Sequence, residues 1–352
     1  MLTPGLIDLQ VNGFAGVDFN SGALSAADID RALEAMLACG VTACLPTLIT
    51  ATPAELAARL TALDEAIAAS RLGPLMCPGY HLEGPFLNPA AGYAGCHPPA
   101  AMTAADPSLV DHLLTLSGRP VLLTTVAPEV EGGIDFIKEM RRRNMLVAIG
   151  HSACTFESAA AAADAGATLS THLGNGLPQT LPKLDNALFA QLAEERLVAT
   201  FIADGIHVPP NALKAMIRAK GHQASVLVTD AVSAACAPTG VYPFAGMQVE
   251  RLDDGSVRIP GAVGLAGSSL RLDDAVRNIV KWNIATFGQA VEMASTRVAD
   301  LLAPVLQGHG IALAVAEVEW SAQMTVERVR VGDEERKYRS AMTMEENHND
   351  RP

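Results

Sequence analysis

Short apolar runs alternate eight times with longer stretches rich in alanine and leucine through the first two thirds of this chain. This alternation indicates repeated strand–helix units, which place parallel strands at the centre and helices outside. No GxGxxG turn follows the first run, so an open dinucleotide-binding sheet lacks its main signature. We therefore expect an α/β protein with a closed (β/α)8 barrel of the TIM type. The expected strands cover residues 6–11, 42–48, 75–80, 121–126, 146–149, 168–171, 198–203 and 225–229.

The remainder of the chain predicts smaller β elements. Residues 247–250 and 256–259 flank Asp253-Asp254-Gly255, which indicates a hairpin inserted after the eighth strand. Residues 312–331 alternate in strand fashion, and charged and polar residues dominate the end of the chain. We expect a barrel with the inserted hairpin near 247–259 (residues 1–305), a small β appendage (306–338) and a disordered tail (339–352).

Charge and composition argue against several kinds of partner. The formal net charge of -13 repels nucleic-acid phosphates and anionic lipids. No run reaches the roughly 18 apolar residues that span a bilayer, and the N-terminus has no basic region followed by an apolar core. The six cysteines show no CxxC spacing, so we expect reduced thiols. These features predict a cytoplasmic protein without nucleic-acid or membrane partners.

Five strand-length runs end in a residue that can bind a metal or move a proton, namely Glu83, His151, His172, His207 and Asp230. The carboxyl ends of parallel barrel strands share one face, so these side chains should meet at the mouth. A glutamate with two histidines suits zinc or a similar divalent ion and leaves an open coordination position. A single strand-end histidine is more often structural, whereas three donors at three strand ends favour a catalytic metal.

Proton transfer would fall to Asp230, which ends the eighth expected strand opposite the three donors. A capping or turn role is the structural alternative for this aspartate. His97 and His207 lie in loops containing Gly and Pro that would overhang the mouth. Neutral imidazoles there could bind substrate or polarise a carbonyl, and surface histidines without a function are the alternative.

Several motifs together, in order and approximate spacing, resemble the N-acetylglucosamine-6-phosphate deacetylases of the amidohydrolase superfamily, over nearly the whole chain up to Leu302. The motifs are PGLIDLQVNGFAGVDFN, HLEGPFLNP, AIGHS, STHLGNG, FIADGIHV, LVTDA and LAGSSLRLDDAVRN. The resemblance implies a homodimer, a metal-dependent hydrolysis of an acetamide, and one divalent ion, with zinc the first expectation and iron the second. It assigns metal binding to Glu83, His151 and His172, proton transfer to Asp230, and polarisation of the acetyl carbonyl to His97.

The same resemblance implies the substrate contacts. His207 matches the family's sugar-contacting histidine, and Asn175 with Gly176 matches the stretch that holds the phosphate. Many amidohydrolases hold a second metal with two histidines on the first strand, where this chain has Gln10 and Asn12. Amide side chains are poor zinc ligands, so we expect one metal.

Two departures from the family pattern leave alternatives open. Lys183 stands where the family places an arginine that commonly reaches the neighbouring subunit's site, and lysine cannot reproduce a bidentate fork on phosphate. The family also usually has several strands of a small β-sandwich before the PGLIDLQ-like strand, so we expect either a misplaced gene start or a sandwich reduced to its C-terminal strands. The favoured substrate is N-acetylglucosamine 6-phosphate. An amidohydrolase for an unphosphorylated or different N-acyl substrate is the first alternative, and a non-enzymatic binding protein is the second.

Overall fold

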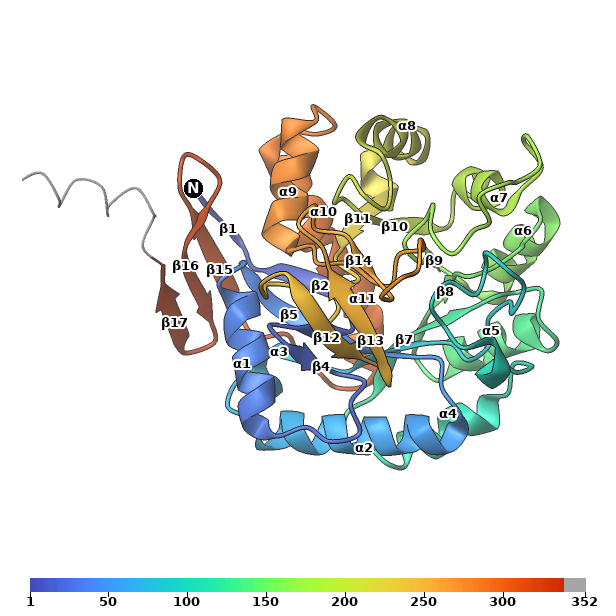
Figure 1. Cartoon of the computed structure of the whole chain (residues 1–352), viewed down its shortest axis with the longest axis horizontal. Helices are drawn as coiled ribbons and strands as arrows, with labels where there is room; N and C mark the ends of the chain where they lie inside the picture. The colour runs from blue at the N-terminus through green and yellow to red at the C-terminus, as the bar shows by residue number, and fades with distance from the viewer. Residues whose placement is uncertain (339–352) are drawn as a thin grey trace, which may run out of the picture.

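The computed structural model describes residues 1–338, and a parallel eight-stranded barrel lies at its centre (Figure 1). Each barrel strand pairs with the next one along the chain, as short right-handed crossovers dictate. The closed barrel predicted from the sequence is therefore confirmed. Its strands are β2 (Leu6–Val11), β5 (Val41–Ile49), β6 (Tyr80–Glu83), β7 (Val121–Val126), β8 (Leu146–Ile149), β9 (Leu169–Ser170), β10 (Val198–Ile202) and β11 (Ser225–Val228).

The barrel closes between β2 and β11 through a short seam rather than a continuous ladder. Val11 and Ala231 form an isolated parallel bridge, and the main-chain N–H of Asp230 donates to the carbonyl of Gln10 at 2.9 Å. A side-chain contact adds to it, because the Thr229 hydroxyl donates to Asp8 at 2.6 Å. These contacts bring the first and last barrel strands together at the mouth.

Helices cover the outside of the barrel (Figure 1), and local signals set their ends. In α2, Thr52 and Glu55 form a capping box and Pro53 occupies the first turn. Its buried residues Leu56, Leu60, Leu63 and Ile67 recur at helical spacing and pack on the sheet. The helices are α1 (Ala26–Leu37), α2 (Pro53–Ala69), α3 (Gly73–Met76), α4 (Pro107–Leu114), α5 (Gly133–Arg142), α6 (Phe156–Ala165), α7 (Ala187–Ala193), α8 (Pro210–Lys220), α9 (Leu272–Lys281), α10 (Phe287–Ala294) and α11 (Thr296–Gly308), with 3-10 turns η1 (Pro99–Ala101) and η2 (His222–Ala224).

The strand expected at 75–80 was placed wrongly. Residues Gly73–Met76 form the short helix α3, and the strand begins only at Tyr80. Pro74 suits the first turn of a helix, and a short buried apolar run does not reveal its own period. Residues 287–308 form two helices, because the chain turns at Ser295, whose hydroxyl donates to the Val291 carbonyl.

Smaller antiparallel sheets accompany the barrel. The expected hairpin falls on β13 (Met247–Arg251) and β14 (Val257–Arg258), and β12 (Gly240–Phe244), which the sequence did not reveal, pairs with β13. The appendage is a four-stranded sheet in the order β1, β15, β16, β17, and its edge strand comes from the N-terminal residues. The strands outside the barrel are β1 (Leu2–Pro4), β3 (Gly13–Phe14), β4 (Val17–Asp18), β12, β13, β14, β15 (Ala316–Trp320), β16 (Val326–Val331) and β17 (Glu334–Lys337). The tail expected at 339–352 lies outside the described residues.

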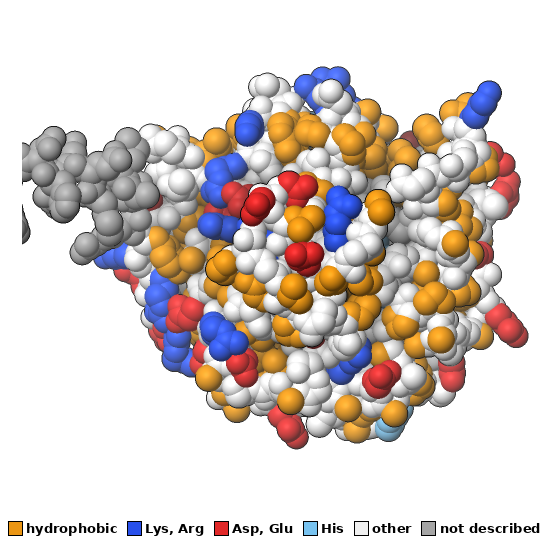
Figure 2. All heavy atoms as spheres, viewed as in Figure 1, with side chains coloured by type: hydrophobic (Ala, Val, Ile, Leu, Met, Phe, Trp, Pro, Cys, Tyr) orange, Lys and Arg blue, Asp and Glu red, His pale blue; other side chains and the backbone are white. Residues whose placement is uncertain are grey.

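The helices and one face of the surface can be compared with the expectation that the protein binds neither membranes nor nucleic acids. Within residues 1–338, no helix has the length and apolar character needed to cross a bilayer. On the face shown in Figure 2, Lys and Arg lie in several separate groups with acidic residues among them. This face therefore presents no continuous basic surface of the kind that binds phosphate backbones.

Candidate active site

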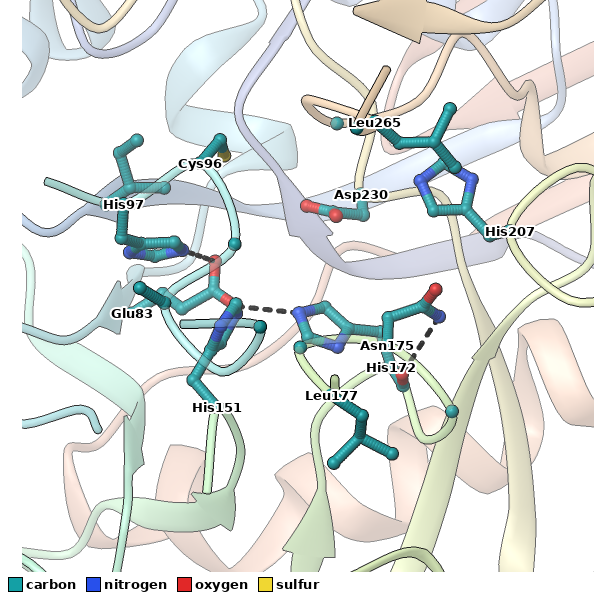
Figure 3. A pocket seen from close by; sticks show the side chains of 18 of the residues that line it. Glu83, Cys96, His97, His151, His172, Asn175, Leu177, His207, Asp230 and Leu265 are labelled. Carbon is teal, nitrogen blue, oxygen red and sulfur yellow. Dashed lines mark hydrogen bonds and ion pairs between the residues drawn. The ribbon is translucent and has the colours of Figure 1, made fainter. Parts of the chain in front are cut away.

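Glu83 is the centre of a buried cluster of histidines at the mouth of the barrel (Figure 3). Its Oε1 lies 3.0 Å from Nε2 of His172 and 3.3 Å from Nε2 of His151. Its Oε2 lies 3.7 Å from Nε2 of His97. Glu83 ends β6, while His151 and His172 each lie two residues beyond the ends of β8 and β9, so the strand ends bring together three residues that are far apart in sequence.

The hydrogen bond of His151 leaves one of its ring nitrogens free to bind a metal. Nδ1 of His151 donates to the carbonyl oxygen of Tyr93 at 2.7 Å, so its Nε2 carries a lone pair. That Nε2 is buried and has no hydrogen-bond partner among the described residues, although it lies near Glu83. The residues therefore fit a divalent cation, since a buried carboxylate surrounded by imidazole nitrogens is a common ligand set.

The geometry also admits His97 into the ligand set. One ligand atom each from Glu83, His97 and His151 lies within 4.8 Å of the others. Nδ1 of His97 lies 2.9 Å from the hydroxyl of Thr50, which fixes the ring. Burial, followed by the neighbouring His151, lowers the pKa of His97 to about 3, so this imidazole is neutral at physiological pH. A neutral ring there can bind a metal or donate to a carbonyl.

Electrostatics couple the carboxylate to its neighbours. Burial would raise the pKa of Glu83, but its contacts with the nearby His151 and His172 outweigh this effect and hold the pKa well below the usual range. For His172 burial acts to lower the pKa, and the contact with Glu83 reverses the direction and raises it. Glu83 is therefore an ionised carboxylate, and its negative charge favours a cationic neighbour.

Asp230 faces the cluster from the other side of the pocket (Figure 3). It lies two residues beyond the end of β11, and burial, followed by the charge of Glu83, raises its pKa to about 6. A carboxyl group with a pKa near 6 can both accept and return a proton close to neutral pH. The pocket that holds both groups has a volume of about 820 Å³.

Three residues of the site have positive φ angles, a region that side chains other than glycine rarely adopt. The φ angles are 50° for His151, 29° for His172 and 49° for Asp230. Each follows a barrel strand, so the sharp turn aims the side chain across the mouth. Backbone strain of this kind concentrates at functional sites.

The expected substrate contacts divide into two groups. His207, Asn175 and Gly176 all line the pocket, and Nδ1 of His207 lies 2.6 Å from Asp204, which orients the ring. Gly176 has φ +61°, and a Cβ there would lie 2.9 Å from Nδ1 of His151, so glycine is needed. Lys183 is exposed and is not among the lining residues. Within residues 1–338, no lysine or arginine lines the pocket.

Several contributors to the site were not assigned a role from the sequence. Thr50 and the main chain of Tyr93 orient two histidines, and Cys96 lines the pocket as a thiol whose pKa burial raises to about 12. Gln10 and Asn12 were noted only as poor metal ligands, yet both donate to Asp230. Their spacing of two residues, which puts both on one face of a strand, was the available signal.

A parallel barrel with this buried cluster at its carboxyl end is the arrangement of a barrel enzyme with a candidate metal centre. Residues 1–252 match the Amidohydrolase family, and the chain belongs to that family. It is 35% identical over 306 residues to N-acetylgalactosamine-6-phosphate deacetylase of Escherichia coli O157:H7, covering 86% of this chain and 78% of the relative. It is 30% identical over 307 residues to N-acetylglucosamine-6-phosphate deacetylase of Bacillus subtilis (strain 168), covering 86% and 75%.

A solved structure resembles the whole arrangement. A mutant form of N-acetyl-D-glucosamine-6-phosphate deacetylase from Mycobacterium smegmatis, in complex with N-acetyl-D-glucosamine-6-phosphate, superposes with a TM-score of 0.84 at 26% identity. The match covers 95% of this chain and 86% of that one. The family resemblance inferred from the motifs is thereby confirmed.

Proposed function

We propose that this protein hydrolyses the acetamide of an N-acetylhexosamine 6-phosphate to the amino sugar phosphate and acetate. The observation that carries the proposal is the pairing, across one pocket, of the Glu83 histidine cluster with Asp230. The Glu83 histidine cluster suits a metal, and Asp230 suits proton transfer. The similarity to deacetylases of both epimers supports the substrate class.

Glu83, His151 and His172 would hold one divalent metal, zinc in the first instance, which supplies a more acidic water and a polarised acyl carbonyl when bound. Asp230 accepts the proton of the attacking water. His97, neutral and fixed by Thr50, donates to the acyl oxygen as negative charge develops there. Asp230 then returns its proton to the departing nitrogen, so that the amine leaves uncharged together with acetic acid, which ionises to acetate by releasing its proton to solvent or to the free amine.

The substrate's polar groups would find partners among the other residues that line or flank the pocket. His207, held by Asp204, would contact a sugar hydroxyl. Asn175 and Gly176 offer main-chain and amide groups to the phosphate, and Lys183 adds a positive charge either from its own loop or as part of a homodimer. The sugar epimer is a separate question. We propose N-acetylglucosamine 6-phosphate as the first candidate substrate and N-acetylgalactosamine 6-phosphate as the second. The relative at 35% identity supports the second candidate.

The absence of lysine and arginine from the described pocket lining supports a second candidate function. Without a lysine or arginine in the lining, a 6-phosphate has no such cation to pair with there, so an unphosphorylated N-acetylhexosamine would be at less of a disadvantage. The two candidates differ in one measurable quantity, the ratio of kcat/KM with and without the 6-phosphate.

A deacetylation assay on both 6-phosphates and both free sugars, with metal content measured on the same sample, tests the proposal. We expect phosphorylated substrates to be preferred and about one equivalent of divalent metal. Asp230→Asn should lower kcat by roughly 10²- to 10⁴-fold while retaining the metal. Normal turnover by the metal-loaded Asp230→Asn variant would refute the role of Asp230, and no hydrolysis of any of the four sugars by wild type would refute the proposed function.

A further inference from the structure

Two buried amides bind the same oxygen of Asp230. Nδ2 of Asn12 donates to Oδ1 at 2.7 Å, and Nε2 of Gln10 donates to that oxygen at 3.2 Å. Asn12 is 1% exposed and Gln10 is 2% exposed. Within residues 1–338, no hydrogen bond reaches Oδ2 of Asp230, and Asp230 lines the pocket. One carboxylate oxygen is therefore anchored and the other is available.

The main chain holds these groups in place. The N–H of Asp230 donates to the carbonyl of Gln10 at 2.9 Å, and the N–H of Asn12 donates to the carbonyl of Ala231 at 2.7 Å. Gln10 lies in β2 and Asp230 follows β11, so the two segments meet at the barrel seam. The positions of the amides and of the carboxylate are consequently set together.

We propose that Asn12 and Gln10 are positioning residues that make Oδ1 of Asp230 an anchor and leave Oδ2 as the single oxygen that accepts and returns the proton. The inference rests on the proposed function, in which Asp230 carries that proton. It concerns two residues that act on the reaction through Asp230.

Amide donors suit this task because they do not titrate near neutral pH. When Asp230 is a carboxylate, Oδ1 accepts from both amides. When Oδ2 carries the proton, Oδ1 is the carbonyl oxygen of the acid and still accepts from both. The anchor therefore persists through both proton transfers, whereas a histidine in either position would compete for the same proton.

Asn12 makes the shorter bond, and that bond acts to lower the pKa of Asp230 against the larger effects of burial and of Glu83. Removing the Asn12 donor should therefore move the protonation of Asp230 to higher pH. A residue that only supported the fold would reduce stability without this effect. The pH profile thus separates positioning from packing.

The test compares Asn12→Ala and Asn12→Asp with Asn20→Ala in the metal-loaded enzyme. We expect both Asn12 variants to lose roughly ten- to a hundredfold in kcat, as for a hydrogen bond to a charged group, with KM changed little. The acidic limb of the kcat profile should move to higher pH. Asn12→Asp keeps the shape but removes the donor, so it should be no better than Asn12→Ala.

Asn20 is a matched control, because it is 2% exposed and its Nδ2 donates to the Thr47 carbonyl at 2.9 Å rather than to Asp230. Asn20→Ala should lower stability and leave the acidic limb where it is. Unchanged kcat and an unchanged limb in Asn12→Ala, or an equal movement of the limb in Asn20→Ala, would overturn the inference.

A measurement without turnover keeps the two proposals apart. The carboxyl carbon of Asp230 can be titrated by NMR in aspartate-labelled protein, with the signal assigned through Asp230→Asn. We expect its titration to move to higher pH in Asn12→Ala. An identical titration in wild type and Asn12→Ala would overturn the positioning role whether or not the protein hydrolyses amino sugars, whereas a movement without any hydrolysis would refute the proposed function alone.

Discussion

Asp8 is a carboxyl group placed where charge is costly, and replacing it with asparagine should stabilise the protein in a pH-dependent way. The side chain is 0% exposed, at the seam between β2 and β11. Oδ2 accepts from the Thr229 hydroxyl at 2.6 Å, and Oδ1 accepts from the N–H groups of Thr229 and Gln10 at 3.2 and 3.3 Å. Asparagine can keep Oδ1 as the acceptor and donate to the Thr229 hydroxyl, which can turn to the Gln10 carbonyl at 3.3 Å.

The magnitude follows from the pKa of Asp8, which burial raises from 3.8 to about 7 despite the hydrogen bonds from Thr229. The folded protein therefore holds this proton to higher pH than the unfolded chain does, and folding takes up a proton between the two values. Stability from this group is fully present below about pH 4 and is lost as the pH rises through about 7. At about 1.36 kcal/mol per pH unit, the loss amounts to roughly 4 kcal/mol.

Urea unfolding of wild type and Asp8→Asn at about pH 4.5 and pH 8 tests this expectation. The free energies of unfolding should be similar at the lower pH, and the variant should be more stable at pH 8 by up to roughly 4 kcal/mol. Asp28→Asn is a control of opposite sign, because hydrogen bonding to Ser25 lowers the pKa of that carboxyl. A difference between wild type and Asp8→Asn that does not grow from pH 4.5 to pH 8 would refute the reasoning.

Four further substitutions probe the site. His172→Asn should reduce bound metal to well below one equivalent, whereas His97→Asn should keep the metal and lose turnover. Metal loss in His97→Asn but not in His172→Asn would instead make His97 the ligand. Gly176→Ala should lower kcat/KM by at least roughly tenfold, because φ is +61° and its Cβ would press on His151, and a fully active variant would show that the loop can move. Lys183→Ala should raise KM for the 6-phosphate roughly tenfold but not for the free sugar, and equal effects on both would remove Lys183 from phosphate binding.

The barrel could be predicted from the sequence because its strands and helices follow one another in a simple repeat. Parallel topology then determines that residues at strand ends share one face. For this reason Glu83, His151, His172 and Asp230 could be placed in one pocket without any knowledge of distances. The third strand was misplaced because 75–76 are as apolar in helix α3 as they would be in a strand.

Other features depend on contacts that no local pattern reports. Thr50 fixes His97 across 47 residues, and Asn12 reaches Asp230 across 218. The choice between His97 and His172 as ligands also depends on side-chain distances, since Nε2 of His172 lies 3.0 Å from Glu83 and Nε2 of His97 lies 3.7 Å from it. The sequence alone could place Lys183 near a motif but could not show that it lies outside the pocket lining.

The left-handed backbone at His151, His172 and Asp230 sets stability against catalysis in this protein. Each such residue costs on the order of 1–3 kcal/mol relative to a relaxed backbone, and glycine at the same place would relieve the strain. Selection for thermal stability alone would therefore favour the loss of the very side chains that define the site. Any engineering of a more robust variant should hold these three positions constant and seek its gains elsewhere, as at Asp8.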